Sequence, residues 1–322
     1  MRHFMKEIPS LNQVKNSIEN FNNEKLLKIS DFENIEQYLE YFDSIFKKHF
    51  TNYHYMAQFQ KPENFLFKLF RVREYVPIKN KNLFSEYSYP PSAFVGNGRC
   101  NFKNLPVFYC SNNPITALLE VVRNTEYKSK KFCISVWTLL DNKQDFILGS
   151  FLQSELHPSN VFKQLATSFL NNIDKAFENK LSLDQKLGVI EFYKFIDKKF
   201  IEDADYSISA YLSHQELYAK HNFASDMIIY PSAQSDSKAI NFAIQPNFVD
   251  NCMKVERFYI LELNAFDNLT DKFTITFSSY GKIEKNVILW RNLKPGDAFY
   301  EKNFKIDFSS YLENFKEFNY IK

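Results

Sequence analysis

The chain has 322 residues, of which 45% are hydrophobic, 24% are charged and 17% are aromatic, while only six are glycine. Collagen-like chains and flexible linkers need far more glycine, and a chain this apolar can bury a core, so both classes and wholesale disorder are excluded. Forty basic against 38 acidic residues leave a net charge of +2. The charges are interspersed without a basic stripe, which disfavours nucleic acid as a partner.

The sequence predicts neither a membrane segment nor a metal site. The first residues hold no apolar run of signal-peptide length, and no stretch approaches the ~18 apolar residues of a membrane helix. Four cysteines, at positions 100, 110, 133 and 252, form no Cys-x-x-Cys pair and have no histidine cluster beside them. Widely spaced thiols of this kind are typical of a reducing compartment. We therefore expect a cytoplasmic protein that needs no metal and no membrane.

The predicted elements begin with a helical region over residues 1–62. In residues 31–50 the apolar side chains recur at steps of three and four, as in an amphipathic helix, and Asp31 is placed to cap that helix. A strand is predicted over residues 63–74. Residues 77–114 hold five of the eleven prolines, which is typical of a long structured loop.

The second half of the chain mixes helices with strands. Asn113 and Pro114 suit the N-cap and the first position of a helix. Helices are also expected over residues 158–202 and 207–222, and strands over 130–140, 226–232, 240–244, 257–263, 272–280 and 286–290. Because the elements show no regular βαβ alternation, the fold class expected is α+β.

These elements suggest three consecutive parts. The first is a helical N-terminal region, residues 1–62. The second is a mixed core, residues 63–250, with a helical insertion at about 150–204. The third is a β-rich C-terminal region, residues 251–322.

A short glycine-rich stretch, residues 96–101, is the first candidate binding element. Its glycines, Gly98 among them, let the backbone approach a ligand closely, and the planar guanidinium of Arg99 suits a phosphate. An ordinary tight turn with a solvated arginine explains the same residues.

Three further residues combine reactive chemistry with an informative position. Arg71 shares a face of its predicted strand with apolar side chains, so it lies at the strand end or inside a cleft. Glu120 lies on the helix that starts at residue 114, opposite the apolar stripe; a solvated carboxylate paired with Arg123 is the alternative. Ser232 ends a buried strand, where a hydroxyl serves either a ligand or a turn.

Taken in order, these features resemble the RES domain family, toxin-like proteins named for their Arg, Glu and Ser. The resemblance covers about residues 65–135 and 205–247. The matching motifs are Phe70-Arg71-Val72, Gly98-Arg99-Cys100-Asn101, Pro106-Val107-Phe108-Tyr109, Ala117-Leu118-Leu119-Glu120, Ile229-Tyr230-Pro231-Ser232 and Asn241-Phe242-Ala243.

The resemblance implies an α+β core similar to the ADP-ribosyltransferases, with NAD as substrate. Such proteins break the nicotinamide–ribose bond and pass ADP-ribose to water, phosphate or a protein, and a partner antitoxin commonly neutralises them. It implies catalytic roles for Glu120, Arg71 and Ser232. It also implies NAD binding by Arg71, Gly98, Arg99, Asn101, Tyr109 and Ser232. Tyr109 is the first choice, and Tyr89 the second, for an aromatic wall against the nicotinamide.

Two alternatives stay open at this point. Cys100 stands where the family usually has an aromatic residue, and Asn104-Leu105 replaces a usual glycine. Both departures favour a non-catalytic NAD- or nucleotide-binding sensor or interaction module. A ribonuclease-like toxin is the second alternative, and the near-neutral charge disfavours it. The sequence leaves open the acceptor of ADP-ribose, the existence of an antitoxin or protein target, and the oligomeric state.

Overall fold

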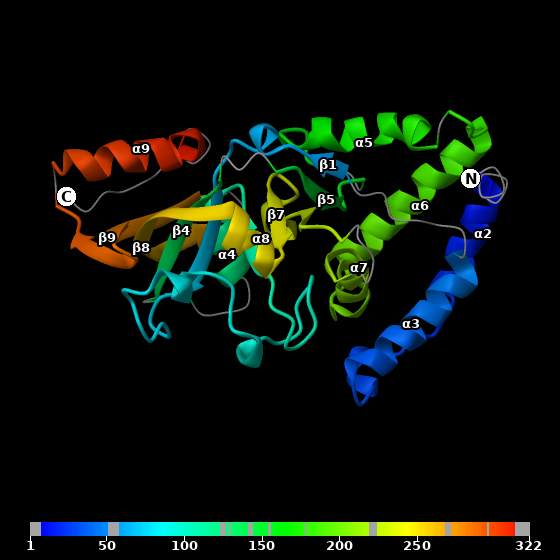
Figure 1. The fold of residues 1–322 in the computed structure, drawn as a ribbon, viewed down its shortest axis with the longest axis horizontal. Coiled ribbons are helices and arrows are strands. Elements are labelled where there is room, and N and C mark those ends of the chain that lie inside the picture. The colour runs from blue at the N-terminus through cyan, green and yellow to red at the C-terminus, as the bar shows by residue number, and fades with distance from the viewer. Residues whose placement is uncertain are drawn as a thin grey trace. The chain divides into compact units, whose positions relative to one another are not determined.

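The computed structural model describes residues 8–50, 58–122, 127–128, 130–140, 144–153, 156–177, 179–218, 224–267, 272–294 and 296–312. They form mixed α+β structure, as predicted (Figure 1). The chain folds into two compact units that alternate along the sequence. The first comprises residues 1–59, 92–106 and 147–231; the second comprises 60–91, 107–146 and 232–322. This division differs from the three consecutive parts expected, since residues 63–250 contribute to both units.

The first unit is mainly helical. Its helices are α2 (Leu11–Asn22), α3 (Ile35–Phe50), α5 (Lys163–Ala176), α6 (Leu183–Glu202) and α7 (Ser207–Leu217), with a 3₁₀ turn, η1 (Ile29–Asp31), before α3 and another, η4 (Ser92–Phe94), later in the chain. Its strand order is β1 (Gln58–Gln60), β5 (Phe146–Ser150) and β6 (Met227–Pro231), and β5 runs parallel to β6. The N-terminal region and the helical insertion therefore belong to one unit.

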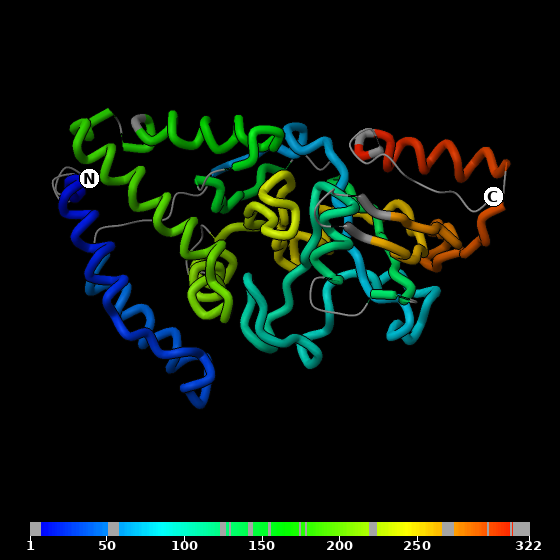
Figure 2. Tube along the Cα trace, turned by 180° about the vertical axis from the view of Figure 1, so that it is seen from behind, coloured from blue at the N-terminus to red at the C-terminus, as the bar shows by residue number. Residues whose placement is uncertain are grey.

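Aromatic side chains join the N-terminal helices to the insertion. The ring of Phe21 in α2 lies 5.7 Å from that of Phe195 in α6, and Phe50 in α3 lies 5.4 Å from Phe192. Helices α2 and α6 lie side by side (Figure 2). Gly188 of α6 permits this close approach, because a Cβ there would lie 2.9 Å from the carbonyl oxygen of Pro9. In α3 these contacts bury the apolar stripe that the periodicity of residues 31–50 predicts, since Phe42, Phe46 and Phe50 are all buried.

The predicted cap of α3 is wrong by three residues. Asp31 belongs to η1, and its carboxylate accepts a hydrogen bond from the Lys28 N–H at 2.9 Å. Asn34 Oδ1 instead accepts from the Gln37 N–H, also at 2.9 Å, and so caps α3. Both side chains are good caps, and the 3₁₀ turn decides between them.

The second unit is built on an antiparallel sheet. Its strand order is β7 (Ile240–Ile244), β3 (Phe108–Ser111), β2 (Leu69–Glu74), β4 (Lys131–Leu139), β8 (Met253–Asp267), β9 (Lys272–Glu284) and β10 (Val287–Asn292). Its helices are α4 (Pro114–Val122), α8 (Pro246–Cys252) and α9 (Ala298–Leu312), with 3₁₀ turns η2 (Pro62–Asn64), η3 (Phe84–Tyr87) and η5 (Ala233–Ser235). The strands of the β-rich tail thus extend the sheet of the predicted core.

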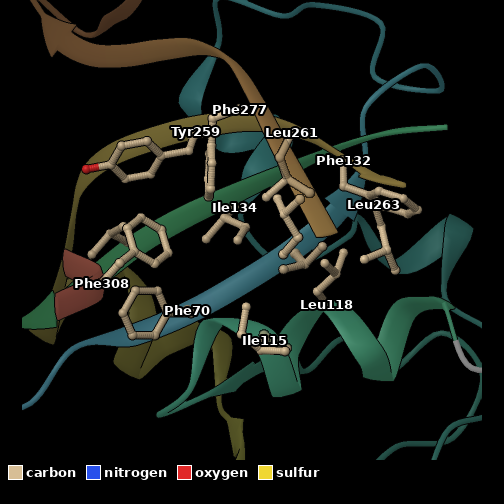
Figure 3. Packing of buried hydrophobic residues seen from close by; sticks show 14 of the residues in the cluster. Phe70, Ile115, Leu118, Phe132, Ile134, Tyr259, Leu261, Leu263, Phe277 and Phe308 are labelled. Carbon is tan, nitrogen blue, oxygen red and sulfur yellow. The ribbon is translucent and has the colours of Figure 1, made fainter. Parts of the chain in front are cut away.

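Helices α4 and α9 pack on the same face of this sheet. Phe70 of β2 lies among Ile115 and Leu118 of α4 and Phe308 of α9, all of them at most 2% exposed (Figure 3). The prediction of a β-rich tail did not include α9, in which the buried residues Tyr300, Phe304 and Phe308 recur at every fourth position. The strand-like runs that precede α9 in the sequence led to the prediction of strands for the whole tail, so the helical period of α9 was overlooked. None of the helices described is long and apolar enough to cross a bilayer.

Candidate functional site

The helix that carries Glu120 begins as predicted. Asn113 Oδ1 accepts hydrogen bonds from the backbone N–H groups of Ile115 at 2.9 Å and Thr116 at 3.1 Å, and Pro114 is the first helical residue. Proline suits this position because its missing N–H would have no partner there. The apolar stripe of α4 enters the core, which leaves Glu120 half-buried on another side of the helix.

Glu120 accepts two hydrogen bonds from residues distant in the sequence. Ser232 Oγ and Asn241 Nδ2 each lie 2.7 Å from Glu120 Oε1. Ser232 is 0% exposed and Asn241 is 5% exposed, so both donors are buried. We call these three residues the Glu120 cluster. The carboxylate is therefore anchored to protein donors, and Arg123, its suggested surface partner, lies outside the described residues.

Main-chain bonds hold Ser232 in place. Its N–H donates to the Ala239 carbonyl at 3.0 Å, and its own carbonyl accepts from the Ser237 N–H at 2.9 Å. These bonds close the turn that leads into β7, the strand of Asn241. The turn considered for Ser232 is therefore present, and a role of its hydroxyl in ligand binding stays a prediction.

Arg71 lies on the other side of the sheet from the Glu120 cluster. Its strand neighbour Phe70 packs against α4, so alternation directs Arg71 to the opposite face. Its Nε donates to the Ser88 carbonyl at 3.1 Å and its Nη1 to the Tyr109 carbonyl at 2.8 Å, with the guanidinium 5.1 Å from the Phe108 ring centre. The structure does not bring the Arg71 side chain to Glu120.

The Arg71 guanidinium keeps its charge in this setting. Burial, with a smaller contribution from the positive charge of Arg73, lowers the pKa of Arg71 to about 10. The group is still protonated at neutral pH. Its bonds to carbonyl oxygens tie the segment around residue 88 to β3.

Tyr109 faces the same side of the sheet as the Glu120 cluster. Strand β3 pairs with β7 so that Ser111 lies opposite Asn241 and Tyr109 opposite Ala243. Residues two apart on a strand share a face, which gives Tyr109 and Asn241 a common side. Tyr89 has a different partner: its hydroxyl donates to Asp250 Oδ2 at 2.6 Å, and this bond, together with burial and the negative charge of Asp250, raises the pKa of Tyr89 to about 12.

The glycine-rich stretch lies in the first unit, whereas the Glu120 cluster lies in the second. Gly98 and Asn101 exchange backbone hydrogen bonds of 2.9 and 3.3 Å, and Asn101 Nδ2 donates to the Gly96 carbonyl at 2.7 Å. The tight turn considered for these residues is therefore present.

Arg99 is not the solvated arginine of that simple turn. Its Nη1 donates to the carbonyls of Phe200 and, at 3.1 Å, Ile201, and its guanidinium lies 5.2 Å from the Tyr206 ring centre. A cation at the C-terminal end of a helix compensates for its unpaired carbonyls. Arg99 thus caps α6 within the first unit.

The residues that the structure describes include no candidate metal-binding cluster. In that part of the chain no three or more His, Cys, Asp and Glu side chains gather where they could hold a metal ion. Cys100, Cys110 and Cys133 are buried, Cys252 is partly exposed, and all four are in the reduced state.

Asn241 is the one member of the Glu120 cluster to which the sequence assigned no role. It belonged to a matching motif, and the available signal was a polar residue within the apolar strand Ile240–Ile244, all of whose residues are buried. A buried amide requires a hydrogen-bond partner, which the strand pattern alone does not identify.

No protein-family model matches this chain, and no curated protein matches it at a significant level of similarity.

Proposed function

We propose that this protein consumes NAD by breaking the bond between nicotinamide and ribose, on a core of ADP-ribosyltransferase-like fold. The observation that carries the proposal is the Glu120 cluster. Its members come from three separate motifs of the RES resemblance, and two of them donate to one carboxylate oxygen of the third at 2.7 Å. A catalytic side chain must be held in a fixed geometry by packing and hydrogen bonds, and the two buried donors supply such support to Glu120.

The reaction suits a fixed carboxylate. The C1′–N1 bond breaks and its electron pair goes to the nicotinamide nitrogen, which loses its positive charge. The ribose carbon becomes oxocarbenium-like, and an acceptor oxygen bonds to C1′ and releases its proton. A carboxylate beside this carbon stabilises the developing positive charge or orients the acceptor. Glu120 is the residue proposed for that role.

The remaining residues of the resemblance have different support. Tyr109 shares a sheet face with Asn241, which fits an aromatic wall near the carboxylate. NAD contacts by Arg71, Gly98, Arg99 and Asn101 stay predictions from the resemblance. The side chains of Arg71, Arg99 and Asn101 bond main-chain carbonyls of the protein itself. A guanidinium has five N–H donors, so such bonds and a phosphate contact are compatible.

Nicotinamide release from NAD tests the proposal. Purified wild type is compared with Glu120→Gln and Ser232→Ala, and with Glu63→Gln, which changes an exposed carboxylate of the same unit. We expect Glu120→Gln to lower kcat by about 100-fold or more, and Glu63→Gln to leave it unchanged. Thermal unfolding of each variant separates lost chemistry from lost folding.

The outcomes distinguish the candidate functions. Parallel reactions in water, phosphate and cell extract identify the acceptor as water, phosphate or a protein. Background release by wild type and Glu120→Gln, with NAD bound to both, contradicts catalysis and supports the nucleotide-binding sensor. Growth arrest on expression, relieved by Glu120→Gln, supports a toxin and justifies a search for an antitoxin.

A further inference from the structure

The Asn241 side chain makes a contact that its strand does not require. Four of the five residues of β7 are apolar, and Ile240, Phe242, Ala243 and Ile244 are all 0% exposed. A buried amide in such a strand is unfavourable unless it is hydrogen-bonded. Asn241 Nδ2 donates a hydrogen bond to the Glu120 carboxylate, 121 positions away in the sequence.

The backbone around Asn241 is tied to the start of the helix that carries Glu120. The Ile240 N–H donates to Asn112 Oδ1 at 2.9 Å, while the Ile240 carbonyl accepts from Ser111 Oγ at 2.7 Å and from the Asn112 N–H at 3.2 Å. Asn113, the next residue, caps α4. Strand β7 and helix α4 are thus held by one short connection.

The two donors to Glu120 lie on different structural elements. Ser232 lies in the turn before β7, and Asn241 lies in the sheet itself, paired with Ser111. Because both donate to Oε1, they fix the orientation of the carboxylate as well as its position. A side chain on a paired strand is held more rigidly than one in a turn.

We infer that Asn241 is a positioning residue that orients the Glu120 carboxylate for the reaction at the ribose. This inference rests on the proposed function, since it assigns Asn241 a role in the same site. It predicts an effect on kcat rather than on KM, because Asn241 acts through Glu120 and not through the substrate. A misplacement of about 1 Å in a reacting group costs about 100-fold in rate.

The test uses the full chain with Asn241→Ala and Asn241→Asp. Asn303→Ala is the matched control, because that amide donates to the Phe299 carbonyl at 2.8 Å within α9 and does not touch Glu120. We expect Asn241→Ala to lower kcat by about 10- to 100-fold with KM within about twofold. In Asn241→Asp the donor becomes a second carboxylate, and activity should recover at low pH, where the two carboxyls share a proton. Thermal unfolding of each variant at the same pH values separates a recovery of the chemistry from a recovery of the folded state.

A double-mutant cycle makes the inference testable without NAD. The equilibrium constant for unfolding is measured for wild type, Asn241→Ala, Glu120→Gln and the double variant. We expect a coupling of about tenfold, as for a hydrogen bond to a charged group. Additive effects overturn the inference, and so does wild-type kcat in Asn241→Ala. If wild type releases no nicotinamide, the proposed function fails, and the cycle still decides whether Asn241 holds Glu120.

Discussion

Replacing Asp307 with asparagine should undock the C-terminal helix from its sheet. Asp307 of α9 is buried and accepts hydrogen bonds from Lys68 Nζ, from Arg257 Nε at 2.7 Å and Nη2 at 2.8 Å, and from the Tyr259 hydroxyl at 2.5 Å. Asparagine keeps the shape of the side chain and removes its charge. Two cations are then left beside a neutral amide in a largely buried site.

The magnitude follows from the burial of the partners. Removing one member of a buried ion pair costs about 3–5 kcal/mol. Lys68 and Arg257 keep 21% and 15% of their side-chain surface exposed, and Arg257 retains Glu256 at 2.8 Å. Partial solvation and this second partner reduce the penalty, so we expect a loss of about 3 kcal/mol, at the lower end of that range.

Urea unfolding measures this loss, with Glu301→Gln as control, because Glu301 is an exposed carboxylate of the same helix. The control should stay within about 0.5 kcal/mol of wild type. Limited proteolysis should also cleave α9 faster in Asp307→Asn. A loss below about 1 kcal/mol, with proteolysis unchanged, would refute the argument that these charges anchor the helix.

The pH dependence of the wild type gives an independent check. Burial alone would raise the pKa of Asp307, but the bonds from Arg257, Lys68 and Tyr259 outweigh it and hold that pKa below its usual range. The stabilisation is therefore complete above the ordinary carboxyl pKa of about 3.9 and is lost as the pH falls through the lowered value. Asp307→Asn should not show this acid-dependent loss.

Two further predictions concern the first unit. Gly188→Ala should destabilise it by about 1 kcal/mol, because a Cβ 2.9 Å from the Pro9 carbonyl costs about 1–3 kcal/mol and outweighs the ~1 kcal/mol gain in helix propensity. Thermal unfolding measures this loss. Gly96→Ala is the neutral control, because no atom lies within 4 Å of the added Cβ. Burial raises the pKa of Glu216 despite its 2.6 Å bond from Ser225 Oγ, so its contribution to stability is complete below the ordinary carboxyl pKa and is lost as the pH rises through the raised value. Urea unfolding between about pH 4 and 8 should therefore show a smaller loss in Glu216→Gln than in wild type, and parallel curves would contradict this assignment.

Local patterns predicted most of the helices and strands. The helical periods led to α3, α6 and α7, and the Asn113-Pro114 pair marked the first residue of α4, since these signals depend only on near neighbours. The same patterns missed β5 and α9 and chose Asp31 over Asn34 as a cap. In each of these cases a short turn or the packing of a buried surface, and not the local sequence pattern, determined the structure.

Local patterns were also unable to predict which residues of the candidate site come into contact. Glu120 and Ser232 were singled out from the sequence, and Asn241 only belonged to a matching motif, but their separations of 112 and 121 positions say nothing about contact. The pairing of β3 with β7 and the turn before β7 bring them together. The NAD-binding roles expected for Arg71 and Arg99 stay predictions, and the carbonyl oxygens that these two side chains bond in the structure are ones that no local pattern identifies.

The sequence by itself determined the α+β class and the main amphipathic helices, because periodicity and capping act over a few residues. Only the tertiary structure decided that the chain alternates between two units, that α9 packs beside α4, and that two buried donors converge on Glu120. Strand register and helix docking join residues far apart in the chain, so the energy that selects them comes from the buried surface as a whole.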